Sequence, residues 1–389
     1  MRESSSSPEI ADILHAGINL YVQKYGSLPK EHYAIINALK ACRTSALGGH
    51  VKRCGHCGYE EISYNSCRNR HCPKCQGKAA KEWTKKRSDE LLPVPYFHVV
   101  FTIPQELNPV AVRNRRPFYN LMFKAVSQTL LELAKNKKPL GAEIGFFAVL
   151  HTWGQNLVDH PHIHCVIPNG GLSKNKNRWK KGNPNYFLPV KVLSALFRGK
   201  FLAFFQDAVK TNTLRFHGKT SYLEKENDYR AFLAGLYQKN WFVYAKQPFA
   251  GPDQVIQYLS RYTHKIAISN RRILALENGQ VSFLWRDYKD QNRMKSMTLD
   301  IVEFIRRFLL HFLPKGFMRI RYFGFLGNRI RKQMIDLCRK LIQKVLSHRG
   351  KKVNKVLVLN SPDCNNKVCP QCQKDFLLFA FLLSTLPAG

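Results

Sequence analysis

Five cysteines fall within residues 54–75, and their spacing constrains this chain more than any other feature. The segment reads CGHCGYEEISYNSCRNRHCPKC and contains two Cys-x-x-Cys pairs, Cys54 with Cys57 and Cys72 with Cys75, separated by fourteen residues. A loop of about this length lets two such pairs close around one Zn²⁺, because thiolates suit this borderline-soft, four-coordinate ion. We therefore expect a small zinc ribbon that contains the alternating segment YEEISYN as a strand.

Other cysteines leave the ligand set open. Cys67 and His71 lie within the same segment and could replace a member of either pair, or build a second site with His50 or Cys42. Near the C-terminus, Cys364, Cys369 and Cys372 include a further Cys-x-x-Cys, CPQC. The options for a fourth ligand there, Cys338 and His348, are distant in the sequence. Clustered pairs in a cytosolic chain favour metal binding over disulfides.

The charge of the chain indicates what it binds. There are 62 Lys and Arg against 26 Asp and Glu, a formal net charge of +36, and so large an excess predicts a nucleic-acid partner. Arg68 and Arg70 beside the cysteines are candidate DNA contacts. No uninterrupted apolar run reaches 18 residues and the N-terminus has no secretory pattern, so we expect no membrane partner and a cytoplasmic protein.

Three alternating histidines occur in the segment DHPHIHCVIPNGG, residues 159–171. Side chains two apart on a strand share a face, so His162 and His164 should present two imidazoles side by side on an otherwise apolar, central strand. Two imidazoles are an incomplete metal shell. The candidates for a third ligand are Gln155, His160 and His264.

Two tyrosines lie four residues apart in QYLSRYTHK, a segment predicted to be a short helix. At this spacing Tyr258 and Tyr262 share one helical face. Such a pair is usually an ordinary aromatic contact, but in a basic chain with a histidine pair it also suits nucleophilic attack on phosphodiesters. A phenol needs activation for that attack, and a metal bound by the histidines could stabilise the developing charge.

Taken together, the motifs resemble those of a known family. HPHIHCVIPNGG resembles the His-hydrophobe-His motif of the HUH endonucleases, and YLSRYTHKIAISNRR resembles the two-tyrosine motif of the rolling-circle insertion-sequence transposases. YNSCRNRHCPKCQ is similar to the N-terminal zinc-binding domain of these transposases, and FIRRFLLHFLPKGFMRIRYFGFLGNR to the segment after their catalytic domain. The resemblance covers roughly residues 30–340.

The resemblance implies nicking and strand transfer on single-stranded DNA at transposon ends and target. It implies His162 and His164 as ligands of Mg²⁺ or Mn²⁺, and Tyr258 and Tyr262 as nucleophiles that form 5′-phosphotyrosine links. It also implies an antiparallel sheet with the histidine strand at its centre and the tyrosine helix across it.

Strands and helices mix without strict alternation, which predicts an α+β fold. We expect a helical and zinc-binding domain over residues 1–92, a catalytic domain over 93–297, and a basic, helical region with the CPQC over 298–389. Aromatic and basic residues interleave in the last region, so Arg319 and Arg321, together with Arg261 of the tyrosine helix, are further candidate DNA contacts.

Three alternatives remain at the level of sequence. The chain could be a zinc-ribbon DNA-binding protein without catalysis, or a rolling-circle replication initiator or relaxase with the same chemistry. A His-x-His at a strand end also suits a zinc hydrolase, but that reading explains neither the tyrosine pair nor the charge.

Overall fold

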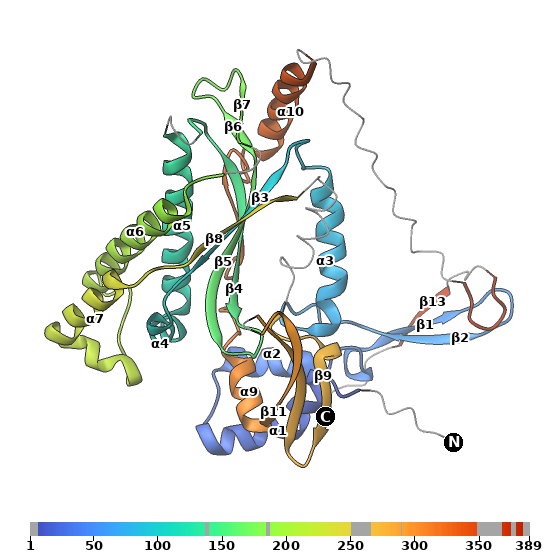
Figure 1. Cartoon of the computed structure of the whole chain (residues 1–389). Helices are drawn as coiled ribbons and strands as arrows, with labels where there is room; N and C mark the ends of the chain where they lie inside the picture. The colour runs from blue at the N-terminus through green and yellow to red at the C-terminus, as the bar shows by residue number, and fades with distance from the viewer. Residues whose placement is uncertain are drawn as a thin grey trace. The chain divides into compact units, whose positions relative to one another are not determined.

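The computed structural model describes residues 7–136, 140–183, 187–249, 266–288, 290–347, 368–374 and 379–383. These residues form an α+β fold, as expected (Figure 1). The chain divides into two compact units: Met1–Ala79 with Ile268–Leu309 and Asn354–Gly389, and Ala80–Ala267 with Leu310–Val353. Each unit is thus assembled from separated stretches of the chain.

The first unit contains two N-terminal helices, α1 (Ile10–Tyr25) and α2 (Lys30–Lys40), in the region expected to be helical. Gly26, with φ +84°, ends α1. Helix α9 (Ile301–Leu309) packs on α1 at Gly17, where an added Cβ would lie 2.6 Å from the Ile301 side chain. The missing side chain therefore lets the two helices approach closely.

Two three-stranded sheets complete the first unit. One has the order β13-β1-β2, formed by Phe379–Leu383, Gly49–Arg53 and Glu60–Tyr64. The other has the order β11-β10-β9, formed by Arg293–Asp300, Gln280–Asp287 and Ile273–Glu277. Asn278 and Gly279, with φ +49° and +74°, make the tight turn between β9 and β10 that an Asn-Gly pair predicts.

The second unit is built on a five-stranded sheet of order β12-β4-β5-β3-β8. Every neighbouring pair is antiparallel, and the histidine strand β5 (Asp159–Pro168) is central, as expected. Its neighbours are β4 (Gly145–Trp153) and β3 (Tyr96–Thr102), and β8 (Val243–Phe249) is one edge. The other edge is β12 (Ile320–Gly324), which lies in the region expected to be helical. This segment is a strand because its backbone pairs with β4.

Helices cover one face of this sheet. The second unit contains α4 (Asn108–Arg113), α5 (Arg115–Lys135), α6 (Val190–Lys210), α7 (Glu226–Gln238), α10 (Arg331–Ser347) and a small hairpin of β6 (Gly170–Leu172) and β7 (Trp179–Lys181). Helices α5 and α6 lie together on one side of the sheet (Figure 1). Ile163, Cys165 and Ile167 of β5 are buried in the core on that side.

The opposite face of the sheet is apolar at one end and carries histidines at the other. Helix α3 (Pro73–Ser88) contains residues of both units, and its Trp83 ring makes an edge contact with Phe147 of β4, the ring centroids being 5.9 Å apart. Because side chains alternate along β5, His162 and His164 lie on this face, beyond the apolar end. No helix among the described residues is long and apolar enough to span a bilayer.

Candidate metal centres

Three imidazoles converge on the central strands of the sheet. His151 of β4 pairs directly with His162 of β5, and His164 follows two residues along the same face. One ring nitrogen from each of His151, His162 and His164 lies within 4.8 Å of the others. The expected histidine pair is therefore part of a triad, which can supply three nitrogen ligands to one divalent ion.

The third member of the triad was not among the residues proposed from sequence. Gln155 lies in the turn between β4 and β5, His160 is exposed, and His264 falls outside the described residues. His151 is buried within GFFAVLHTW, a strand that carries no motif of its own. Only the pairing register of β4 with β5 reveals it.

Hydrogen bonds orient two of the three rings. Nδ1 of His162 lies 2.7 Å from the backbone carbonyl oxygen of His160, to which it can donate. Nδ1 of His164 lies 2.8 Å from Nε2 of His98 on β3, and the two rings are stacked. These contacts make Nε2 the nitrogen that His162 and His164 can offer to a metal. A set of three imidazoles suits Mn²⁺ better than Mg²⁺, which prefers oxygen.

A buried histidine fixes the turn beside the triad. Nε2 of His311 donates to the carbonyl oxygen of Leu157 at 3.1 Å, and its Nδ1 lies 3.2 Å from the Thr152 hydroxyl. Burial lowers the pKa of His311 to about 3, so the ring is neutral at physiological pH. The turn from β4 to β5 is thereby held next to the first residues of the histidine strand.

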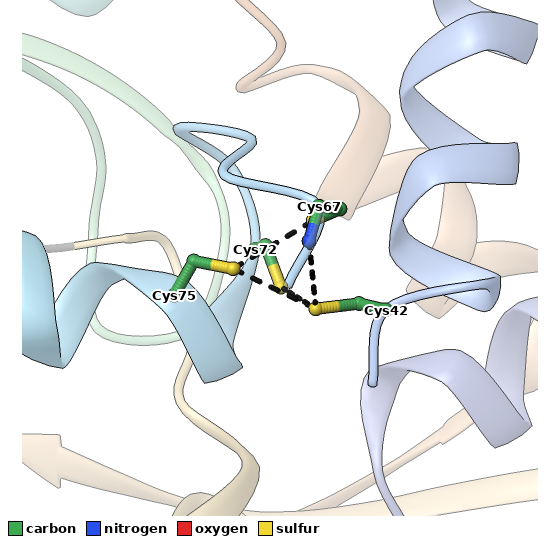
Figure 2. Close-up of side chains that lie close together, drawn as sticks. All are labelled: Cys42, Cys67, Cys72 and Cys75. Atoms are coloured by element: carbon green, nitrogen blue, oxygen red, sulfur yellow. Dashed lines mark hydrogen bonds between the residues drawn. The ribbon is translucent and has the colours of Figure 1, made fainter. Parts of the chain in front are cut away.

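One cysteine cluster gathers Cys42, Cys67, Cys72 and Cys75 (Figure 2). The Sγ–Sγ distances are 3.5 Å for Cys42 and Cys72, 3.6 Å for Cys42 and Cys75, and 3.7 Å for Cys67 and Cys75. Four sulfurs bound tetrahedrally to zinc at about 2.3 Å would lie about 3.8 Å apart, whereas a disulfide needs about 2.05 Å. The cluster therefore fits a structural zinc site.

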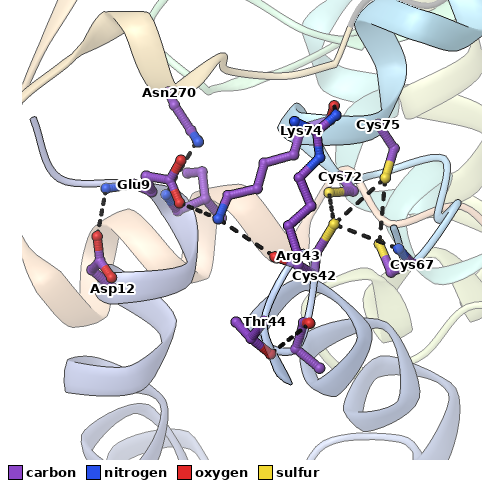
Figure 3. A network of polar contacts seen from close by, with 12 residues as sticks. Glu9, Asp12, Cys42, Arg43, Thr44, Cys67, Cys72, Lys74, Cys75 and Asn270 are labelled. Atoms are coloured by element: carbon purple, nitrogen blue, oxygen red, sulfur yellow. Dashed lines mark hydrogen bonds and ion pairs between the residues drawn. The ribbon is translucent and has the colours of Figure 1, made fainter. Parts of the chain in front are cut away.

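Polar contacts tie this cluster to the start of α1 (Figure 3). The Lys74 ammonium forms an ion pair with Glu9 and lies 3.5 Å from the Cys42 carbonyl oxygen. The Arg43 guanidinium donates to the Lys74 carbonyl at 3.2 Å. Ile10 N–H donates to Asn270 at 3.3 Å, so the ends of several segments of the first unit meet here.

A second cluster gathers Cys54, Cys57, Cys369 and Cys372. Its Sγ–Sγ distances are 3.7 Å for Cys54 and Cys372 and 3.6 Å for Cys57 and Cys369. Backbone N–H groups of Cys57 and His56 lower the pKa of the Cys54 thiol to about 6, which favours the thiolate that a metal needs.

The ligand sets therefore differ from the single ribbon site that the sequence predicted. The pairs Cys54/Cys57 and Cys72/Cys75 lie in different clusters. Cys54 and Cys57 lie with Cys369 and Cys372, whereas Cys72 and Cys75 lie with Cys42 and Cys67. Cys67 lies in the cluster with Cys42, which is one of the alternatives that the sequence left open. His71 is buried and belongs to neither cysteine cluster.

Comparison with known proteins gives the family. A family model described as "Transposase zinc-binding domain" matches residues 13–103, and one described as "Putative transposase" matches residues 145–334. "Putative transposase y4qJ" of Sinorhizobium fredii is 50% identical over 337 residues, covering 87% of this chain and 85% of the relative. The chain belongs to the IS91/IS801 family of transposases.

A second transposase relative is more distant. The "Transposase for insertion sequence element IS801" of Pseudomonas savastanoi pv. phaseolicola is 28% identical over 311 residues, covering 78% of this chain and 72% of the relative. No solved structure matches the chain. In this transposase, the zinc-binding-domain model covers Cys42, Cys67, Cys72 and Cys75, and the model described as "Putative transposase" covers the histidine triad.

Two of the arginines that were expected to bind DNA instead make contacts within the transposase. Arg319 is buried, and Arg321 donates to Asn120 at 2.5 Å while its guanidinium lies 4.2 Å from the centre of the Phe123 ring. The aromatic residues around them, including Phe317, belong to the core rather than to a stacking surface. Their contacts thus favour a structural role.

The remaining expected residues of the transposase fall into two groups. Arg68 is exposed and Arg70 is half-buried, both in the loop that precedes the Cys72 pair. Tyr258, Tyr262 and Arg261 lie outside the described residues.

Proposed function

We propose that this transposase nicks and rejoins single-stranded DNA at the ends of its element through 5′-phosphotyrosine links. The observation that carries the proposal is the convergence of His151, His162 and His164 on the central strands, with ring nitrogens within 4.8 Å. The chain would hold one divalent ion there, Mn²⁺ or Mg²⁺. When bound, such an ion stabilises negative charge that develops on a scissile phosphate.

The tyrosines would do the covalent chemistry. The phenolic oxygen of Tyr258 or Tyr262 loses its proton and attacks phosphorus, the bond from phosphorus to the 3′-oxygen breaks, and the departing 3′-oxygen takes up a proton. The new phosphotyrosine bond keeps the energy of the diester. A second strand's 3′-hydroxyl can therefore reverse the step and join the strands without a nucleotide cofactor.

Two features support single-stranded DNA as the substrate. The chain carries a net charge of +36, which favours a polyanion. Phe242 and Tyr244, at the edge strand β8, are 76% and 59% exposed. Because Val243 between them and Ala245 after them contact the core, both aromatic rings lie on the histidine face of the sheet, where bases could stack. We expect the reaction to take place on DNA in the bacterial cytoplasm.

Covalent capture tests the proposal. The protein is incubated with labelled single-stranded DNA that carries the end of its element and with Mn²⁺, then denatured and separated by electrophoresis. We expect a labelled protein–DNA adduct that is lost in the Tyr258→Phe/Tyr262→Phe protein and reduced at least about 100-fold in His162→Ala.

The control is Tyr222→Phe, which changes an exposed tyrosine outside the two-tyrosine motif and should leave the adduct unchanged. A folded, metal-loaded protein that binds the DNA but gives no adduct would instead be a DNA-binding protein without catalysis. An adduct that persists in the double Tyr→Phe protein would exclude these two nucleophiles.

A further inference from the structure

The C-terminal Cys-x-x-Cys has no role in the proposed phosphotyrosine reaction. Cys369 and Cys372 lie far outside the zinc-binding region matched at residues 13–103. Within the described residues they nevertheless face Cys54 and Cys57, with each Sγ atom about as far from its neighbour as two sulfurs on one zinc ion. The question is whether the two pairs form one site.

The two pairs have the same local backbone geometry. In CGHCGY, Cys54 N–H donates to the Tyr59 carbonyl at 2.8 Å, and Gly58 N–H donates to the Cys54 carbonyl at 3.0 Å. In CPQCQK, Cys369 N–H donates to the Lys374 carbonyl at 2.8 Å, and Gln373 N–H donates to the Cys369 carbonyl at 2.9 Å.

The backbone also turns in the same way after each pair. The residue directly after the second cysteine has a left-handed conformation in both, with φ +75° at Gly58 and φ +58° at Gln373. For a side chain such as glutamine this conformation is uncommon. Its presence in CPQC indicates that this short segment is folded into the same compact turn as CGHC, a turn that presents both sulfurs on one side.

A separate contact holds the C-terminal segment beside the N-terminal pair. Strand β13 pairs antiparallel with β1, and Phe379 pairs with Arg53, the residue directly before Cys54. Phe379 follows Cys372 by seven residues. The backbone pairing therefore places the C-terminal pair near the N-terminal one without any reference to a metal.

We propose that Cys54, Cys57, Cys369 and Cys372 bind one Zn²⁺, in a site distinct from that of Cys42, Cys67, Cys72 and Cys75. Four thiolates complete a tetrahedral shell and leave no position for substrate, so the site is structural. It fastens the C-terminal segment to the N-terminal ribbon. The inference does not depend on the phosphotyrosine chemistry.

Zinc counting tests the ligand set. In a His162→Ala background, which removes a ligand from the histidine triad, we expect two equivalents of tightly bound zinc by mass spectrometry of the metal. Cys369→Ser/Cys372→Ser should bind one equivalent. The decisive variant is Cys54→Ser/Cys369→Ser, which should also bind one, because both cysteines belong to the same ion.

Two outcomes of the zinc count would overturn the proposal. The proposal fails if Cys369→Ser/Cys372→Ser still binds two equivalents, or if Cys54→Ser/Cys369→Ser binds none, since the two cysteines would then serve different ions. Cys338→Ala, at a buried cysteine outside both clusters, is the matched control and should keep two.

Disulfide mapping gives a readout that does not require the variants to fold. The full-length protein is stripped of metal, oxidised gently and digested, and the linked peptides are identified by mass spectrometry. We expect links between Cys57 and Cys369 or between Cys54 and Cys372, the pairs whose sulfurs are adjacent. Links from Cys54 or Cys57 to Cys72 or Cys75 would instead contradict the proposal and support a single zinc site formed by these four cysteines.

Discussion

His98 determines which nitrogen His164 can offer to a metal. If Nε2 of His164 is the ligand, its Nδ1 carries the proton and donates to Nε2 of His98, 2.8 Å away. His98 must then present a lone pair at Nε2 and carry its own proton at Nδ1. Such partners fix the tautomer and orientation of a ligating histidine, so His98 is a positioning residue.

We expect His98→Ala to weaken Mn²⁺ binding at the triad by about 10- to 100-fold. His98→Gln should recover part of this loss, because its side-chain oxygen can accept the same hydrogen bond. Isothermal titration of the metal measures both, and His15→Ala, at an exposed histidine on α1, is the control. Unchanged affinity in His98→Ala would show that the hydrogen bond has no part in metal binding.

Asp159 makes the stability of the fold depend on pH. Neither carboxylate oxygen has a hydrogen-bond partner among the described residues. Burial raises the pKa of Asp159 to about 7, although Arg115 opposes the shift. The unfolded chain releases this proton near pH 4 and the folded chain near pH 7, so stability falls across that interval and stays low above it.

Asp159→Asn removes this dependence. The variant should gain stability over the parent as the pH rises from 4 to 8, by about 4 kcal/mol at most, since one pKa unit corresponds to about 1.4 kcal/mol. Thermal unfolding at several pH values measures the gain. A constant difference between the two proteins across this range would mean that Asp159 does not titrate as described.

At the scale of elements, strand register builds the triad. Alternation along β5 was enough to predict that His162 and His164 share a face, and the Asn-Gly pair predicted the β9–β10 turn. His151 could not be found in this way, because its role follows from which residue of β4 lies opposite His162. The edge strand β12 was missed for the same reason, since its strand character comes from pairing with β4.

The cysteines show the same limit over a longer range. Spacing within CGHC and CPQC predicts that each pair can bind a metal, but contains no information about which pairs meet. The meeting of Cys57 with Cys369 depends on the fold of the first unit, which brings together segments 312 residues apart.

The edge strand β8 gives a prediction about DNA. Because Phe242 and Tyr244 are exposed on the histidine face, Phe242→Ala/Tyr244→Ala should weaken binding of single-stranded DNA by about 1–3 kcal/mol for each base that loses its stacking partner. Fluorescence anisotropy with a labelled oligonucleotide measures this loss. Mn²⁺ affinity should not change.

The control for the edge strand is Tyr222→Ala/Tyr237→Ala, which removes two exposed tyrosines outside the sheet. If this pair weakens binding as much as the edge pair does, stacking at β8 is not the cause.

At the scale of the whole molecule, the charge should dominate affinity for DNA. With a net charge of +36, we expect contacts to several phosphates and the release of their counterions. For six to ten such contacts, affinity for single strands should fall roughly 10²- to 10⁴-fold between 50 and 200 mM salt. Anisotropy titrations over this range give the slope, and a nearly flat dependence would exclude an electrostatic mode of binding.

The division of the first unit among three stretches has a consequence for its synthesis. Cys57 leaves the ribosome 312 residues before Cys369, which at about 5–20 residues per second is roughly 15–60 s. During that time the N-terminal thiols have no C-terminal partner, while β3, β4 and β5 are made in the first part of the interval. A message interrupted shortly before codon 369 would therefore yield a chain that keeps its histidine triad but has half of one cysteine cluster.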